Sequence, residues 1–390
     1  MSSNYKVASL FCGCGGIDLG LQGGFDLPYQ PKGSIERLKF DIIWSNDFNP
    51  KAMASYRANF TEHYSICGDI VKIVERAQAE RAQAKRVQKD DDNGQGTVKS
   101  DIGSRSNLDG TDGKFLFYGP GIIDVVTGGF PCQPFSLAGK RQGLSDKRGK
   151  LYEAMLDAVS LLKPKLFIAE NVAGLLSAKV GKKLVIEKIE EDFLKIDYVL
   201  SYKVLVASDF GVPQRRERVI IVGTPKVAPV FDFSEVKLGN GLTRHVSVRK
   251  ALKELEGEAW NPAKMHVWSR AKFNKGQGNT TCDPDEPAPT MRAEHHGNIE
   301  FHYKAQDLPQ YRGQSLHDPR RDSCVTRRLS VREAAFIQSF PEGFKFKQSA
   351  TDAYRQIGNA VPPLLAWHIG LAVQSYLDEL NRTKSSSGKS

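Results

Sequence analysis

The chain has 390 residues, of which 40% are hydrophobic, so it can bury a large core and is long enough for more than one domain. It contains no run of eighteen apolar residues and no charged-then-apolar N-terminus, so neither a membrane span nor export is predicted and a cytoplasmic location is expected. The formal net charge of +10 favours a polyanionic partner such as nucleic acid, while six scattered cysteines predict neither disulfides nor a metal site.

The first half of the chain alternates strand-like and helix-like segments. Short apolar runs predict buried strands, and apolar residues at helical spacing predict the helices between them. This alternation is typical of a doubly wound, mostly parallel α/β sheet that helices cover on both faces. The predicted strands are 7–11, 41–45, 122–127, 166–169 and 219–222, and the predicted helices are 151–162 and 182–194.

Residues 72–115 interrupt this alternation. They begin with a repeat of strong helix formers, 76–80 and 81–85, which has almost no apolar stripe, and the acidic run 90–92 then ends the helix. We interpret the region as a solvated surface insertion in a catalytic and cofactor-binding domain of residues 1–223. A nucleic-acid contact is the less favoured alternative.

A second interruption spans residues 224–326, where six of the eight histidines lie and regular patterning is lost. This composition predicts a second, smaller, irregular domain. Residues 327–380 then return to the catalytic domain, with helical patterns at 330–338 and 362–380. The polar tail 381–390 is expected to fray.

A glycine-rich turn and two acids mark the ends of the first strands. The first strand runs into Phe11-Cys12-Gly13-Cys14-Gly15-Gly16, whose glycines let the backbone approach a ligand, although their spacing is not the dinucleotide pattern. Asp47 stands where a ribose is usually bound, Phe48 can stack on a flat ring, and Asp69 suits an adenine amino group. The alternative is that both acids only cap the helices that follow them. No lysine-bearing phosphate cradle is present, and S-adenosylmethionine fits a nucleoside ligand without phosphates.

Three further strings lie near other strand ends. Cys132 follows a predicted strand on a stiff Gly128-Gly129-Phe130-Pro131 turn, and Glu170 ends another strand, where partial burial suits a general acid. Alternation places Gln214, Arg216 and Arg218 on one face of an extended segment, where arginines can bind a base carbonyl or a phosphate. A turn cysteine, a paired carboxylate and a salt-bridged surface strand are the structural alternatives.

Together these strings resemble the DNA (cytosine-5)-methyltransferases of bacterial restriction-modification systems. They occur in the order of that family and span residues 11–362. The matching strings are Phe11-x-Gly13-x-Gly15-Gly16, Asp47, Gly68-Asp69, Pro131-Cys132-Gln133, Asp146-Lys147-Arg148-Gly149, Glu170-Asn171-Val172, Gln214-Arg215-Arg216-Glu217-Arg218, Arg332-Glu333, Gln338-Ser339-Phe340-Pro341 and Gly358-Asn359-Ala360-Val361-Pro362.

The resemblance implies covalent catalysis on a cytosine flipped out of duplex DNA. Cys132 adds to carbon 6, Glu170 holds nitrogen 3 and the exocyclic amine, Arg218 meets the base carbonyl, and Arg216 lies near the nucleophile and the DNA backbone. Residues 135–150 are expected to form a closing loop. The implied S-adenosylmethionine residues are Phe11, Gly13, Cys14, Gly16, Asp47, Phe48, Asp69, Ile70, Gly129, Pro131, Leu151, Asn359 and Val361. The implied DNA contacts are Gln133, Ser136, Lys140, Arg141, Gln142, Gln214, Arg292, His295 and His296.

The expected partner is double-stranded DNA. The protein is expected to be a monomer that does not bind membranes, and a restriction endonuclease of the same specificity is a possible functional partner. Two departures from the family carry no assigned role: the stretch 69–124 is longer than in compact members, and Ala138 is apolar where some members have a hydroxyl. Methylation of tRNA by the same chemistry and a non-catalytic DNA-binding regulator remain alternatives. A cysteine hydrolase is disfavoured because no histidine lies between His63 and His245.

Overall fold

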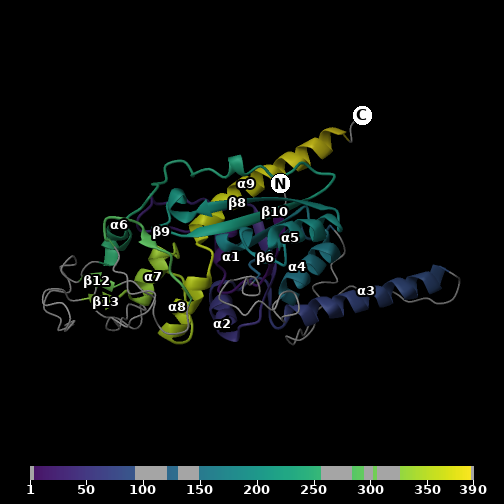
Figure 1. The fold of residues 1–390 in the computed structure, drawn as a ribbon, viewed down its shortest axis with the longest axis horizontal. Helices are drawn as coiled ribbons and strands as arrows, with labels where there is room; N and C mark the ends of the chain where they lie inside the picture. The colour runs from purple at the N-terminus through teal and green to yellow at the C-terminus, as the bar shows by residue number, and fades with distance from the viewer. Residues whose placement is uncertain are drawn as a thin grey trace.

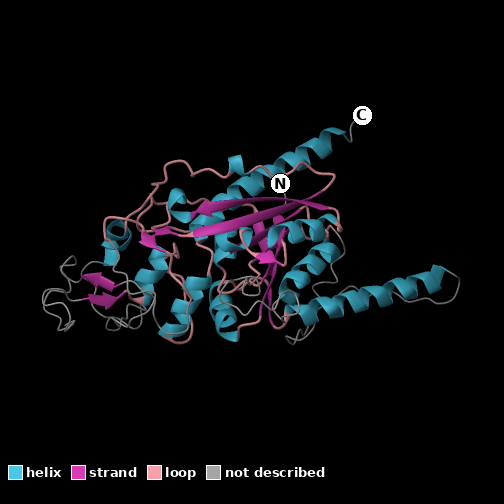
Figure 2. Cartoon of the chain, viewed as in Figure 1, coloured by secondary structure: helices cyan, strands magenta, loops and turns pink. Residues whose placement is uncertain are grey.

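The computed structural model describes residues 4–92, 121–130, 149–255, 283–293, 302–304 and 326–387. Its centre is a seven-stranded sheet of order β3-β2-β1-β4-β5-β10-β8 with helices on both faces (Figures 1 and 2). All neighbouring strands pair in parallel except β10, which runs antiparallel to both β5 and β8. The predicted doubly wound, mostly parallel α/β sheet is therefore confirmed. Its strands are β1 (Tyr5–Leu10), β2 (Phe40–Asp47), β3 (Tyr64–Cys67), β4 (Val125–Gly128), β5 (Leu166–Val172), β8 (Tyr198–Val206) and β10 (Glu217–Pro225).

Helices and short pairings complete the described chain. The α-helices are α1 (Gly16–Gln22), α2 (Pro50–Asn59), α3 (Ile70–Asp92), α4 (Gly149–Leu162), α5 (Val185–Leu194), α6 (Val248–Leu252), α7 (Val331–Ile337), α8 (Ala350–Asn359) and α9 (Pro363–Ser387). Short 3-10 helices lie at Ala173–Leu176, Phe233–Glu235, Ala207–Phe210 and Lys253–Leu255. The short strand pairs are β6 (Lys179–Val180) with β7 (Lys183–Leu184), β9 (Gln214–Arg215) with β11 (Ala288–Pro289), and β12 (His302–Lys304) with β13 (Thr326–Arg328).

Alternation along the strands divides the core between the two faces of the sheet. Val7 and Val125 face the cluster that includes α1 and α9, whereas their neighbours Ala8 and Val126 face the cluster that includes α3, α4 and α5. Helices cover both faces of these strands, so side chains on both faces are apolar. Each strand therefore appears in the sequence as a continuous apolar run rather than as alternating apolar and polar residues.

A third cluster fixes the C-terminal segments against the N-terminal part of the chain. Tyr56 and Phe60 of α2 pack with Phe336 of α7 and Ile357 of α8. Residues that are distant in sequence therefore form one wall, and this wall adjoins the carboxyl ends of β1 and β2.

Several element predictions needed correction. The strand β8 was missed because, as an edge strand with many half-exposed positions, it lacks a continuous apolar run. The tail was expected to fray from residue 381, but α9 continues to Ser387. Asn381 docks this last part by donating to Tyr5 Oη over 3.1 Å.

The segment after β10 packs onto the sheet rather than leaving it at once. Phe231, Phe233, Val246 and Ala251 belong to the same buried cluster as α1 and α9. The proposed domain division at residue 224 therefore stays a prediction, and this packing favours a boundary further along the chain.

The helix predicted at 76–85 is confirmed as part of α3, which ends at Asp92 and extends away from the body of the molecule (Figure 1). Its first turns are anchored, because Val74 and Ala77 are buried against the sheet. Arg81 adds a hydrogen bond to the carbonyl of Leu161. Within the described parts of the chain, no helix is long and apolar enough to cross a membrane.

Candidate active site

A cavity of about 1010 Å³ opens at the carboxyl ends of β1, β2, β4 and β5. This is the edge of a parallel sheet at which ligands bind in doubly wound folds. The cavity brings together every described residue that the sequence assigned to catalysis or to the cofactor. These are Phe11, Gly13, Cys14, Gly16, Asp47, Phe48, Asp69, Ile70, Gly129, Leu151, Glu170, Arg216, Arg218, Asn359 and Val361.

Other assigned residues fall outside the described part of the chain. They are Cys132, Pro131, Gln133, Ser136, Lys140, Arg141, Gln142, His295 and His296. Residues 135–148 of the predicted closing loop also lie outside it, whereas Gly149 and Lys150 begin α4. Phe130 is the last described residue before Cys132. Its carbonyl accepts a hydrogen bond from Asn171 Nδ2 at 2.9 Å, so β5 fixes the chain two residues before the cysteine.

The glycine-rich turn is shaped by close packing on two sides. Gly15 caps α1 with φ +97°, and a Cβ built there would lie 2.3 Å from the ring of Phe60. A Cβ on Gly16 would lie 2.3 Å from the carbonyl oxygen of Val361. Only glycine fits both positions, so the turn lies between α2 and the C-terminal segment.

Asp47 ties this turn to the end of β2. Its Oδ2 accepts from the backbone N–H of Gly13 at 2.8 Å, and its Oδ1 accepts from that of Asn49 at 2.7 Å. Burial raises the pKa of Asp47, while these two hydrogen bonds oppose the rise. Asn49, rather than Asp47, is the N-cap of α2, so the capping alternative is wrong for this acid.

Phe48 and Asp69 lie on the same side of the cavity. The Phe48 side chain is 75% exposed, an unusual position for a large apolar ring and one suited to stacking on a ligand. Asp69 Oδ1 accepts from the backbone N–H of Val71 at 3.0 Å. Asp69 therefore caps α3 with this oxygen and lines the cavity as well, so capping does not exclude a ligand contact here.

A buried acid behind the glycine turn was missed by sequence reasoning. Asp18 accepts from Ser9 Oγ at 2.7 Å and from Tyr56 Oη at 2.6 Å, and burial raises the pKa of its carboxyl group to about 6. His63 Nε2 lies 3.0 Å from the same Tyr56 hydroxyl, and burial lowers the pKa of His63 to about 4. The network fixes α1 to α2, and its only signal in the sequence is an acid on an otherwise apolar helix.

Glu170 and Arg218 form an ion pair on the reactive side of the cavity. Arg218 Nε lies 2.8 Å from Glu170 Oε1, and both side chains are 12% exposed. Glu170 is opposite Ile220 in the β5–β10 register, so Arg218 is its diagonal neighbour on the same face. A Cβ on Gly129 would lie 3.1 Å from Glu170 Oε2, so the glycine leaves room beside this second oxygen.

Arg216 has a different environment from Arg218. It is fully buried, with Nη1 donating to Met291 O at 3.0 Å and Nη2 donating to Gly358 O at 2.8 Å and to Ala360 O at 3.1 Å. Burial, followed by repulsion from Arg218, lowers its pKa to about 9. The expected contact with the DNA backbone conflicts with this enclosure, and the guanidinium instead braces the turn that carries Asn359.

Gln214 also requires correction. Its side chain is fully buried, donates to Gln338 Oε1 at 2.5 Å and accepts from the Met291 backbone N–H at 3.0 Å. Both ends of the amide are thus bonded within the protein, so the predicted DNA contact is not available to it in this structure. Arg292, by contrast, is exposed.

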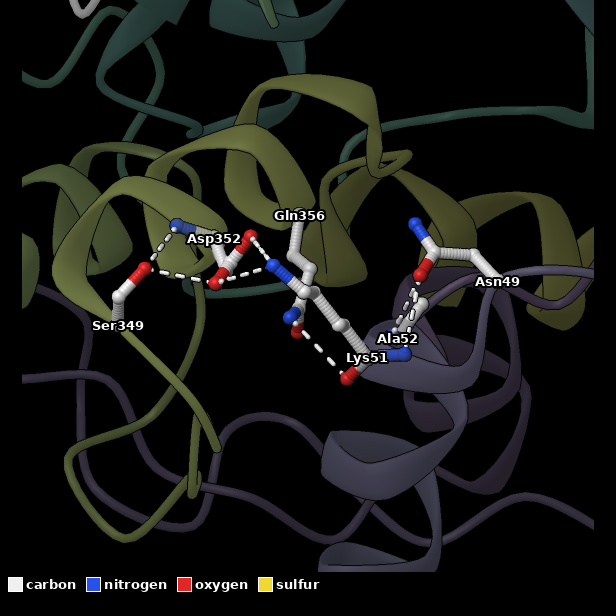
Figure 3. A network of polar contacts seen from close by, with 6 residues as sticks. All are labelled: Asn49, Lys51, Ala52, Ser349, Asp352 and Gln356. Carbon is white, nitrogen blue, oxygen red and sulfur yellow. Dashed lines mark hydrogen bonds and ion pairs between the residues drawn. The ribbon is translucent and has the colours of Figure 1, made fainter.

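A polar network on the cavity wall joins α2 to α8 (Figure 3). Lys51 Nζ donates to both carboxylate oxygens of Asp352 at 2.9 and 3.0 Å, and Gln356 Nε2 donates to Lys51 O at 3.3 Å. Sequence reasoning missed these residues because they lie far apart in the chain. Among the residues described, no three His, Cys, Asp or Glu side chains are grouped so as to hold a metal ion.

Comparisons with known proteins identify the family of the chain. The family model for C-5 cytosine-specific DNA methylases matches residues 5–85 and 99–375. The type II methyltransferase M.NgoFVII of Neisseria gonorrhoeae is 31% identical over 386 residues, which cover 93% of this chain and 84% of that protein. The type II methyltransferase M.BsuRI of Bacillus subtilis is 29% identical over 395 residues, with coverage of 93% and 77%.

Solved structures show the same fold. The S. pombe Dnmt2 methyltransferase aligns with a TM-score of 0.63 at 19% identity and covers 97% of this chain and 100% of its own. The Entamoeba histolytica methyltransferase EhMeth aligns with a TM-score of 0.58 at 14% identity, with coverage of 97% and 99%. The chain therefore belongs to the C-5 cytosine-specific DNA methylase family and is a DNA (cytosine-5)-methyltransferase.

Proposed function

We propose that this enzyme methylates carbon 5 of a cytosine flipped out of a specific double-stranded DNA sequence, with S-adenosylmethionine as the methyl donor. The observation that carries the proposal is one cavity lined both by Phe48 and Asp69, which suit a nucleoside, and by the Glu170–Arg218 pair, which suits a pyrimidine. Donor and acceptor can therefore meet in a shared space.

The described residues fit the cofactor chemically. An exposed ring at Phe48 can stack on adenine, and the carboxylates of Asp47 and Asp69 suit hydroxyl and amino groups rather than phosphates. Gly13 has no atom within 4 Å of a Cβ built on it, so open space adjoins the glycine turn. When bound, S-adenosylmethionine supplies an electrophilic methyl group.

The chain's own residues prepare the pyrimidine for methylation. Cys132 adds as a thiolate to carbon 6, which makes carbon 5 nucleophilic. Glu170 holds nitrogen 3 and the exocyclic amine with the oxygen that faces Gly129, while Arg218 both orients Glu170 and meets the base carbonyl. Carbon 5 then takes up the methyl group, which leaves S-adenosylhomocysteine, and loses its proton to water as Cys132 is eliminated to release 5-methylcytosine. Flipping the base costs a few kcal/mol, which contacts in the cavity must offset.

The region around residues 224–326 is the proposed target-recognition domain, and its first part packs onto the sheet. Arg292 is exposed beside the turn that Arg216 braces, and we assign it, with His295 and His296, to DNA contacts in the major groove. The names of the curated relatives support a role in protecting host DNA beside a cognate endonuclease. We propose that the enzyme works as a monomer in the cytoplasm.

The assignment of Cys132 is tested by trapping. An oligonucleotide with 5-fluorocytosine at the target position, incubated with cofactor, should form a covalent adduct with the enzyme, because fluorine cannot leave as the proton does. Cys132→Ala should form no adduct and lose methyl transfer while retaining DNA binding. Cys67→Ala, at a cysteine that does not line the cavity, is the control and should behave as wild type.

Labelled cofactor offered with plasmid DNA or tRNA separates the proposed substrate from its main alternative. Label in DNA, followed by bisulfite sequencing of host DNA that has been exposed to the enzyme, would identify the modified base and its sequence context. Label in tRNA alone would reject the DNA proposal. An adduct that persists in Cys132→Ala would reject the nucleophile.

A further inference from the structure

The ion pair of Lys51 with Asp352 is a feature of the cavity wall that the proposed chemistry does not use. Both residues line the cavity, and one ammonium group bonds both carboxylate oxygens (Figure 3). The Asp352 side chain is 10% exposed and that of Lys51 is 53% exposed. The pair therefore places two opposite charges at the rim of a partly enclosed space.

Neighbouring groups hold both partners in place. Asp352 lies in the first turn of α8, where Ser349 Oγ donates to its carboxylate at 2.6 Å, and a helix N-terminus favours a negative charge. Ser349 and then Lys51 hold the pKa of Asp352 below its usual range, so the carboxyl group is ionised at neutral pH. On the other side, Asn49 caps α2 by accepting from Lys51 N, and Gln356 donates to Lys51 O.

The charge of the ligand makes this pair consequential. S-adenosylmethionine carries a carboxylate, an ammonium and a sulfonium group and has a net charge of +1, whereas the demethylated product S-adenosylhomocysteine is neutral. An unpaired lysine at the rim would repel the positively charged S-adenosylmethionine but not the neutral S-adenosylhomocysteine. The net charge of this wall therefore affects the ratio of the affinities for S-adenosylmethionine and S-adenosylhomocysteine.

We propose that Asp352, by neutralising Lys51, is a specificity-determining residue that raises the affinity of the cavity for the methylated cofactor relative to its demethylated product. The proposal rests on the assignment of the cavity to S-adenosylmethionine. It predicts that the two partners, when removed singly, shift this preference in opposite directions. A merely structural tie between α2 and α8 would instead weaken both ligands in the same way from either side.

The test measures the dissociation constants of both ligands by calorimetry at low salt and without DNA. Asp352→Asn should weaken S-adenosylmethionine relative to S-adenosylhomocysteine by about twofold to fivefold, the size expected for one charge acting through a water-rich rim. Lys51→Met should shift the ratio the opposite way, and Lys51→Glu should shift it further. These differences should shrink in molar salt, where the screening length falls to about 3 Å.

A second ion pair provides a matched control. Lys39 and Asp378 lie 2.9 Å apart with side chains 45% and 29% exposed, and neither lines the cavity. Lys39→Met and Asp378→Asn should leave the ratio of the two dissociation constants unchanged.

The proposal would be overturned if the ratio of the two dissociation constants shifted in the same direction in Asp352→Asn and Lys51→Met, or if it changed in neither variant. Should Asp352→Asn fail to fold, the two Lys51 variants still decide, because a ratio that does not change from Met to Glu is equally fatal. A wild-type protein that binds neither ligand would reject the cofactor assignment itself, which keeps the two failures distinct.

Discussion

At the scale of single residues, the site depends on charges that are partly removed from water. Glu170 and Arg218 form an ion pair, whereas the two terminal nitrogens of the buried Arg216 guanidinium donate to backbone carbonyls of three separate residues and its Nε has no partner among the described residues. Removing one partner from such an arrangement leaves a buried charge without compensation, which costs more than the pair itself contributes. The two arginines of one motif therefore have different environments, since Arg218 pairs with Glu170 at the cavity and Arg216 is enclosed by the protein.

Asp18 gives a pH prediction at this scale. Burial raises the pKa of its carboxyl group from 3.8 to about 6, so the folded state retains a proton that the unfolded state releases. This group's contribution to stability is present below pH 3.8 and is lost as the pH rises toward 6. Between pH 7 and pH 4, the free energy of unfolding of wild type should gain up to roughly 3 kcal/mol relative to Asp18→Asn.

Urea denaturation of both proteins across this pH range measures the gain. Other titrating groups cancel in the difference, because they are common to both proteins. Parallel stability curves for wild type and Asp18→Asn would contradict the assigned titration.

At the scale of elements, the glycine turn acts as a joint between β1, α1 and the segment after α8. Its conformation depends both on the left-handed backbone at Gly15 and on contact with Phe60 from α2. The left-handed backbone of Gly15 and its contact with Phe60 are separate requirements, and a second glycine in the chain allows their effects on stability to be measured separately. Gly33 also has a left-handed backbone, with φ +72°, but has open space around it.

Gly15→Ala should therefore destabilise the fold more than Gly33→Ala does. Both variants incur the left-handed strain of about 1–2 kcal/mol, and only the first also forces the ring of Phe60 to move, which adds about 1–3 kcal/mol. Thermal unfolding measures the difference, and calorimetry should show weaker cofactor binding for Gly15→Ala alone. If both variants lost the same amount of stability, the ring of Phe60 would move aside without an energetic penalty.

At the scale of the whole molecule, the first strand is in contact with the last helix. Tyr5 on β1 donates to Asp378 of α9 at 2.6 Å and accepts from Asn381, so the central part of the sheet is tied to the last helix (Figure 1). The cavity is likewise built from both ends, because residues 9–75 and 352–361 line it together.

Asn381→Ala should lower the free energy of unfolding by about 0.5–1.5 kcal/mol, since it removes a hydrogen bond to Tyr5. Arg382 provides the control, because its Nε donates to Asp378 O within the same helix at 3.3 Å and not to the sheet, so Arg382→Ala should have a smaller effect. Urea denaturation of the two variants and of a chain ending at residue 380 measures these effects. A truncated chain as stable as wild type would restore the expectation of a frayed tail.

Much of the fold and of the site could be predicted because the relevant signals are local. Apolar runs locate the buried strands, and chemically distinctive residues at strand ends, such as Asp47 and Glu170, lie at one edge of the sheet as expected. Pairing over long distances could not be predicted. No local sequence pattern indicates that Lys51 pairs with Asp352, because they lie 301 positions apart in the chain. Strand alternation predicted which face of the segment carries Arg216, but it could not show that other parts of the protein bury that face.

The position of α8 has a consequence for how the enzyme is made. A ribosome synthesises the glycine turn and Phe48 early, whereas the opposite wall at Asp352–Val361 follows much later in the sequence. A nascent chain that has not yet reached α8 therefore holds the first wall of the cavity without the second. The cavity can take its final form only after α8 has been synthesised.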